Sequence, residues 1–425
     1  MESTAPVRYA AAMRSPRKAI LWMLIILVVA VSGLAWFGKG HRLFVARASL
    51  SDAAGDSPEL LSKQAEQERR AAVSTLGPMK HRDGVNAADI YGQAIALYDQ
   101  LTYEEREIFD NASEHKGNPP DTKTAAALYS KVQPIMDLIR HGRSADYVEW
   151  GDAPSIGDYS AYTKRINGVG NLANLAAWEA DYRFSMDPGG AVEDLAAMEK
   201  MNFDNDDSVI GFVGWQTDHF RALNIMAGHV SDLAGEEDPA IMELVDSTAA
   251  ERGFRNAMGG QAATYEVILN ELKNSPDTPP HIAQWFSEAD KASRADQIAG
   301  IQWLIMTERE TGTTFTKTDD EYRQWYESRK AEAAANPIAR ANFRPEFFTR
   351  RLARQMVVTD AMMRAGMAFE QNDEARFQSI TDPISGRPFT FTHTGSGFSL
   401  GSDLKVSDDP KAPPVTLNFS TGPAQ

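Results

Sequence analysis

The chain contains no cysteine. Disulfide bonds, thiolate metal sites and cysteine nucleophiles are therefore excluded. The sequence also lacks a Gly-x-Ser-x-Gly nucleophile elbow, a phosphate-binding loop and a dinucleotide fingerprint, which are the motifs that identify many hydrolases and nucleotide-dependent enzymes. None of its eight histidines form a pair at the spacing of a zinc-binding helix. We therefore expect neither a metal nor a cofactor.

Basic residues are also scarce, with 43 Lys and Arg against 59 Asp and Glu, a net charge of −16. Binding to nucleic acid needs a basic surface that neutralises phosphates, so we expect no nucleic acid partner. The acidic surplus is interpreted as ordinary solubility charge.

One long apolar run is present, from Ala19 to Phe37, and it contains no charged residue. As a helix rising about 1.5 Å per residue it would be about 30 Å long, the thickness of a bilayer's hydrocarbon core. Trp22 lies near one end and Trp36 near the other, as is typical of residues at the headgroup interface. The run therefore predicts a single transmembrane helix whose partner is the lipid bilayer.

The flanks of this run predict its orientation. Basic residues are slightly more numerous ahead of it than behind it: Arg8, Arg14, Arg17 and Lys18 against Lys39, Arg42 and Arg47. A short tail (1–18) and a long following chain fit a retained signal-anchor in a bacterial inner membrane, with the N-terminus in the cytoplasm and the bulk periplasmic. A cleaved signal peptide is the alternative, but the run exceeds the usual apolar region of about 7–15 residues.

The remaining chain divides by composition. Residues 38–85 form a stalk or linker, and residues 86–343 a helical domain. Ala87, Tyr91, Ala94 and Tyr98 recur at helical spacing, and Asn86 is placed to cap that helix. Further helices are expected at 125–140, 169–186, 191–201, 209–233, 239–254, 260–273, 281–309 and 319–336.

The hydrophobic period changes near the C-terminus. Residues 344–402 are expected to form a long helix (344–372) followed by a β-hairpin around Phe389, Phe391 and Phe398. Residues 403–425 form a mostly flexible tail with a possible strand at 415–419. The fold class is therefore mainly α, with a small C-terminal β-hairpin.

Two segments of the helical region resemble parts of a tetratricopeptide unit. Asn-Ala-Ala-Asp-Ile-Tyr-Gly-Gln-Ala-Ile-Ala-Leu-Tyr (86–98) is similar to its first helix, and residues 182–195, around Asp187-Pro188-Gly189, are similar to its turn and second helix. A tetratricopeptide array repeats every 34 residues, and no such period is found. The resemblance implies an α-hairpin or solenoid-like body.

The tail resembles the helix-to-sheet junction of type II secretion pseudopilins, on the motifs Asp382-Pro383…Ser385-Gly386-Arg387-Pro388-Phe389 and Gly397-Phe398-Ser399-Leu400. The whole layout resembles bacterial membrane-anchored envelope proteins of the Planctomycetes–Verrucomicrobia type. This implies a location and a shape, and no activity. Because residues 19–37 lack the pseudopilin glutamate and lie some 300 residues before the tail, polymerisation into a pilus is not expected.

Two groups of residues are candidates for a site. Asp218 and His219 share an apolar helix and could form a catalytic acid–base pair, although a buried histidine satisfied by a neighbour is commoner. The second group combines rings with carboxylates that could line a sugar or peptide groove, or could pin a loop by packing. It consists of Asp146, Tyr147, Trp150, Tyr159 and Tyr162.

These features favour a non-enzymatic, membrane-anchored envelope protein that acts as a scaffold for another envelope protein. An exported hydrolase using carboxylate and histidine chemistry is one alternative. An accessory subunit of a secretion or pilus system is the other.

Overall fold

A computed structural model describes residues 84–113, 120–150, 159–204, 208–233, 238–279, 282, 286–343, 347–407 and 411–421. The predicted tail, membrane helix and nearly all of the stalk lie outside this part of the chain. Among the described residues, no helix is long and apolar enough to cross a membrane. The predicted span at 19–37 is therefore not tested.

The described chain is mainly helical, as predicted. Its helices are α4 (Ala87–Tyr98), α5 (Tyr103–Ser113), α6 (Thr122–Arg143), α7 (Tyr159–Phe184), α8 (Pro188–Phe203), α9 (Val209–Gly228), α10 (Pro239–Leu244), α11 (Ser247–Asn274), α13 (Arg294–Thr311), α14 (Asp319–Ala333), α15 (Pro337–Asn342), α16 (Phe347–Glu370) and α17 (Glu374–Ser379).

Local signals explain where several helices begin. The Asn86 side chain accepts a hydrogen bond from the Ala88 N–H, which confirms the predicted cap of α4. Pro188 occupies the first turn of α8, and Asp187 accepts from the Gly190 N–H. The helical hairpin predicted around residues 182–195 is thus the α7–α8 pair.

The predicted helix at 209–233 ends early, at Gly228, and the predicted helices at 239–254, 260–273 and 281–309 are wrong in their bounds. The stretch 239–254 is interrupted after α10, because Asp246 caps a new helix by accepting from the Thr248 N–H. That helix, α11, continues through Gly259 and Gly260, where a break was expected. Likewise, 281–309 is not one helix, since Ser293 caps α13 and Glu288 has a positive φ of 70°.

The C-terminus forms a three-stranded antiparallel sheet in the order β1 (Thr390–Thr394), β2 (Gly397–Lys405), β3 (Pro414–Ser420). Phe398 pairs with His393 on one side and Phe419 on the other. The predicted hairpin and the possible strand at 415–419 are therefore both present. Alternate residues of β3 are buried, which directs one face of the sheet onto the helices.

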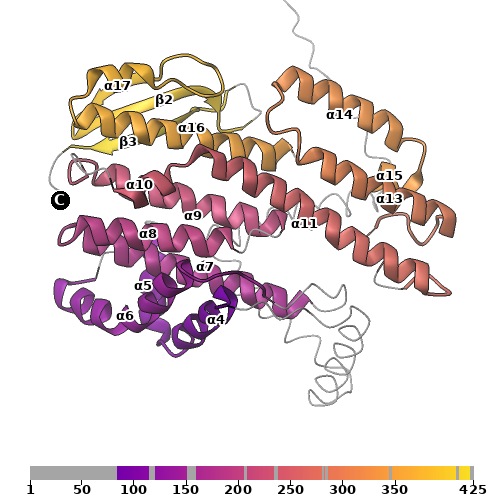
Figure 1. Cartoon of the computed structure of the whole chain (residues 1–425), viewed down its shortest axis with the longest axis horizontal. Coiled ribbons are helices and arrows are strands. Elements are labelled where there is room, and N and C mark those ends of the chain that lie inside the picture. Colours follow the sequence, from indigo (N-terminus) through magenta and orange to yellow (C-terminus); the bar gives the residue numbers. More distant parts are fainter. Residues whose placement is uncertain are drawn as a thin grey trace, which may run out of the picture. The chain divides into compact units, whose positions relative to one another are not determined.

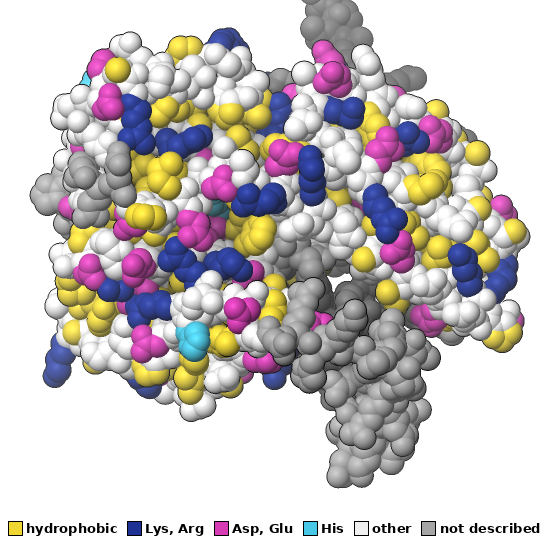
Figure 2. Space-filling model, viewed as in Figure 1, with side chains coloured by type: hydrophobic (Ala, Val, Ile, Leu, Met, Phe, Trp, Pro, Cys, Tyr) yellow, Lys and Arg dark blue, Asp and Glu magenta, His cyan; other side chains and the backbone are white. Residues whose placement is uncertain are grey.

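The compact unit from Asp83 to Gln425 holds three groups of buried apolar side chains. The largest joins α4, α6, α7, α8, the C-terminal half of α16 and the sheet. A second lies where α9, α11 and α16 meet, and a third packs the C-terminal half of α11 against α13 and α15 (Figure 1). On the face seen in Figure 2, basic and acidic side chains are interspersed.

Candidate functional site

His219 lies on α9 with only 4% of its surface exposed. Its Nδ1 is 3.2 Å from a Glu199 oxygen on α8, and its Nε2 is 2.8 Å from an Asp360 oxygen on α16. Burial alone would lower the pKa of His219, but the charges of Asp360 and Glu199 and hydrogen bonds to them raise it to about 10. The ring is therefore an imidazolium whose Nε2 donates to Asp360 and whose Nδ1 forms an ion pair with Glu199.

A neighbouring side chain on α9 also contacts this cluster. The Trp215 indole N–H donates to the second oxygen of Glu199 at 2.5 Å. Asp218, predicted to act with His219, instead pairs with Arg221 at 2.9 Å on the same helix. Burial raises the pKa of Asp218 to about 6, against the lowering effect of Arg221. Asp218 and His219 thus belong to separate ion pairs.

The side chains of the Glu199–His219–Asp360 cluster are almost entirely buried. In the described part of the chain, neither Asp218 nor His219 lines the pocket at the end of α16 or the one at the start of α14. An imidazolium held between two carboxylates has no free nitrogen with which to take a proton. The cluster joins α8, α9 and α16, and its side chains are buried among these helices.

The second predicted group is only partly described. The Asp146 carboxylate accepts from the Val85 N–H at 2.7 Å, and Tyr147 forms a β-bridge with Asn86. Trp150 stacks on Tyr91 with ring centroids 6.2 Å apart and donates to the Asp204 carbonyl at 3.1 Å. These contacts fasten the segment to α4 and α8, which favours packing as its role.

The other two members of that group begin α7. Tyr159 and Tyr162 fall in its first turn, and their side chains lie outside the described residues. The groove predicted from these five residues therefore stays a prediction.

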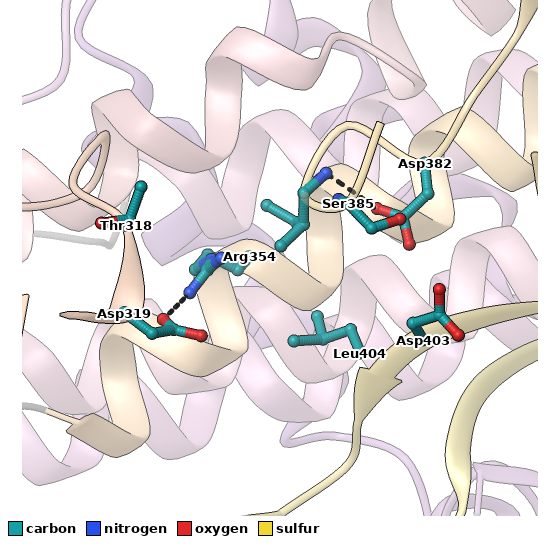
Figure 3. A pocket seen from close by; sticks show the side chains of 8 residues that line it. Thr318, Asp319, Arg354, Asp382, Ser385, Asp403 and Leu404 are labelled. Atoms are coloured by element: carbon teal, nitrogen blue, oxygen red, sulfur yellow. Dashed lines mark hydrogen bonds and ion pairs between the residues drawn. The ribbon is translucent and has the colours of Figure 1, made fainter. Parts of the chain in front are cut away.

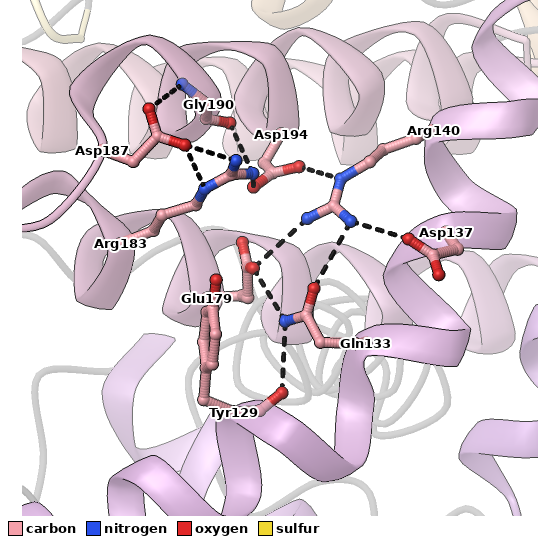
Figure 4. A network of polar contacts seen from close by, with 9 residues as sticks. All are labelled: Tyr129, Gln133, Asp137, Arg140, Glu179, Arg183, Asp187, Gly190 and Asp194. Atoms are coloured by element: carbon pink, nitrogen blue, oxygen red, sulfur yellow. Dashed lines mark hydrogen bonds and ion pairs between the residues drawn. The ribbon is translucent and has the colours of Figure 1, made fainter.

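A second ionic network joins α6 to the α7–α8 hairpin, and no sequence motif predicts it (Figure 4). The fully buried Asp194 carboxylate accepts from Arg140 at 2.5 Å and from Arg183 at 2.8 Å. Arg183 also holds Asp187, the cap of α8. Two guanidinium groups therefore compensate one buried carboxylate and fix three helices together.

Glu179 lies beneath the same arginines. Its buried side chain accepts from Gln133 at 3.1 Å and from Arg140 at 3.3 Å. Burial and the hydrogen bond with Asp194 raise the pKa of Glu179 to about 8. The carboxyl is therefore held as the neutral acid at pH 7, which spares the network a second buried negative charge.

A shallow pocket of about 280 Å³ lies between the start of α14, α16, a turn and β2 (Figure 3). Its carboxylates already have partners within the fold. Asp319 accepts from Arg350 at 3.1 Å and from Arg354, and Asp382 accepts from the Ile384 N–H and the Ser402 hydroxyl. In the described part of the chain, no group of three or more acidic or histidine side chains could hold a metal ion.

No protein-family model, curated protein sequence or solved structure matches this chain. The candidate site therefore rests on geometry alone.

The two partners of His219, Glu199 and Asp360, were not predicted from the sequence. Glu199 directly follows the apolar stretch 195–198 of α8, and Asp360 follows Val357, Val358 and Thr359 on α16. A carboxylate inside an apolar helical run signals a buried partner. The sequence does not say which partner, since Asp360 lies 141 residues from His219.

Proposed function

We propose that this chain is a non-enzymatic scaffold of the bacterial envelope. Residues 19–37 hold it in the inner membrane as a single-pass signal-anchor with the N-terminus in the cytoplasm. The helical, α-hairpin body lies in the periplasm, where it binds another envelope protein. This assignment combines the sequence of the anchor with the compact, mainly helical unit that follows it.

The observation that carries the proposal is the closed state of the Glu199–His219–Asp360 cluster. The charged groups of this cluster pair with one another across three helices. Each imidazole nitrogen of His219 faces a carboxylate oxygen, one from Glu199 and one from Asp360. The Arg140–Asp194–Arg183 network does the same for α6, α7 and α8. Such ionic joints favour a rigid body that presents a constant surface, which suits a scaffold better than a hydrolase.

Crosslinking in native membranes tests the scaffold. The tagged full chain, purified after crosslinking, should enrich one defined set of envelope proteins, and a variant lacking residues 19–37 should lose that set. A clean purification without any partner would contradict the proposal. The hydrolase alternative makes a different prediction: a folded His219→Gln variant would then fail to complement a deletion strain while still enriching the same partners.

A second candidate, an accessory subunit of a secretion or pilus system, is supported by the tail. The three-stranded sheet lies on α16, and the turn at Asp382 is tied to β2 through Ser402. This is the arrangement that the pseudopilin resemblance implies. Enrichment of a secretion platform or its outer-membrane channel in the same crosslinking experiment would favour this candidate over a scaffold of another process.

A further inference from the structure

Within the described part of the chain, strand β1 is a sheet edge that no further strand covers. Among the described strands it pairs only with β2, and four of its five residues are exposed. The opposite edge strand, β3, lies along α9 and α16 and begins with Pro414, which lacks a backbone donor. Edge strands of soluble proteins usually carry charges, proline or a cover, and β1 itself has neither charged residue nor proline.

The hairpin connection fixes which backbone groups of β1 are free. Thr394 pairs with Gly397 across the two-residue loop Gly395-Ser396, so this closing pair exchanges ladder hydrogen bonds. Because hydrogen-bonded positions alternate along an antiparallel ladder, Thr392 also bonds to β2. Phe391 and His393 therefore direct their N–H and C=O groups outward, away from β2.

The sequence of β1 is nearly symmetric about its centre. Read in either direction from Thr392, Thr-Phe-Thr-His-Thr places an aromatic ring and then a threonine. An antiparallel copy centred on Thr392 would pair Phe391 with His393 and Thr390 with Thr394. Phe391 and His393 are T-shaped neighbours within one strand, with ring centroids 4.8 Å apart. No lysine, arginine or carboxylate would meet its like across such a pair.

We propose that the β1 edge is a self-association site at which two copies of this chain join their sheets into one. The outward peptide groups of Phe391 and His393 in one copy pair with those of His393 and Phe391 in the other. Thr392 faces itself across the two-fold axis at a position without ladder hydrogen bonds, where Cα atoms lie about 4.5 Å apart. This inference does not depend on the proposed function.

The association is weak and concentration-dependent. A five-residue edge buries far less than the roughly 800 Å² per partner of a typical stable complex. Attachment of both copies to one membrane would raise their effective concentration.

Because the chain has no cysteine, any disulfide-linked dimer of a single-cysteine variant must form through the introduced residue. In the full chain, Thr392→Cys should give a disulfide-linked dimer under mild oxidation, because the Cα separation at the two-fold axis suits a disulfide. The matched control is Thr416→Cys, which is also exposed on the sheet but on β3. A strong Thr392→Cys dimer with little Thr416→Cys dimer is expected. Equal crosslinking of the two variants, or none with either, would overturn the proposal.

A second variant separates pairing from chance collision. Thr392→Lys places two ammonium groups against each other at the axis and should remove the concentration-dependent dimer in sedimentation velocity, with unchanged circular dichroism. A folded Thr392→Lys protein that associates as the parent does would show that the β1 edge is not the contact.

Discussion

At the scale of single residues, the imidazole of His219 is held between two carboxylates in the interior. Each nitrogen has a partner on a different helix, so one side chain joins α8, α9 and α16. Such a triad adds little stability over a well-packed apolar core, but removing its cation leaves two buried carboxylates uncompensated. The consequences are measurable in stability and in its dependence on pH.

We expect His219→Ala to lower the free energy of unfolding by about 3–5 kcal/mol, the usual cost of breaking a buried ion pair. Urea titration followed by circular dichroism measures the loss. His141→Ala, on the exposed surface of α6, is the control and should change stability by at most about 0.5 kcal/mol. Equal stabilities for the two variants would mean that the Glu199–His219–Asp360 triad does not contribute to the free energy of unfolding.

The pH dependence follows from the same group. The pKa of His219 is about 10 in the fold and about 6.5 in the unfolded chain, so the folded state binds the extra proton between these values. The stabilisation is fully present below pH 6.5 and is lost as the pH rises through 10. The stability difference between the parent and His219→Gln should therefore shrink from pH 6 to pH 10. A difference that stays constant would refute the charged state of His219.

At the scale of elements, the sheet packs on α16 where the Phe419 ring of β3 lies close against Gly366. A Cβ atom built at Gly366 would lie 2.2 Å from the Phe419 ring of β3, whereas one built at Gly92 on α4 meets nothing within 4 Å. The same substitution should therefore have opposite effects at these two helical glycines.

Gly366→Ala should destabilise the chain by about 1–3 kcal/mol, because the added methyl group forces the Phe419 ring to move. Gly92→Ala should stabilise it by up to about 1 kcal/mol through the higher helix propensity of alanine. Thermal unfolding of both variants measures the contrast. If Gly366→Ala were as stable as Gly92→Ala, the sheet would not pack on α16 as described.

The cap of α4 gives a further local prediction. Asn86 accepts from the Ala88 N–H and also exchanges hydrogen bonds with the backbone of Glu149. Asn86→Ala should cost about 1–2 kcal/mol, at the upper end for a capping residue, since it also releases the segment around Trp150. Denaturant unfolding measures this, and a loss below 0.5 kcal/mol (about the effect of a neutral surface change) would argue against the second contact.

The start or end of a helix can be predicted from the sequence when residues within one turn determine it, and not when packing against distant helices does. Asn86 marks the start of α4 by a side-chain cap that acts within one turn, and this start is confirmed. The helix predicted at 191–201 instead begins at Pro188, in what was expected to be a connecting turn. α11 differs because Gly259 and Gly260 would weaken an isolated helix by about 1 kcal/mol each. Packing against α13 and α16 offsets that cost, and such contacts are not visible in a local window.

The candidate site also combines a feature that local sequence predicts with partners that only long-range packing determines. His219 could be recognised as a buried histidine from its apolar neighbours, but Asp218 looked like its partner only because it is adjacent in the chain. Successive helical residues point about 100° apart, so Asp218 turns to Arg221 instead. The true partners lie on α8 and α16 and depend on how three helices pack.

At the scale of the whole molecule, the residues from 83 to 425 form one compact unit whose main core includes both α4 and the C-terminal sheet. The predicted boundary between residues 343 and 344 falls between α15 and α16, and α16 contributes to the same main core. We propose that this unit lies outside the cytoplasm and that residues 19–37 anchor it.

Single-cysteine labelling tests this placement most directly, since the natural chain has no cysteine of its own. In cells with a permeabilised outer membrane, Thr416→Cys should react with a membrane-impermeant maleimide, and Ser3→Cys should react only after lysis. Both variants should sediment with membranes, and removal of residues 19–37 should release the protein. Protection of Thr416→Cys in cells whose outer membrane has been permeabilised, or a soluble full-length chain, would contradict this placement.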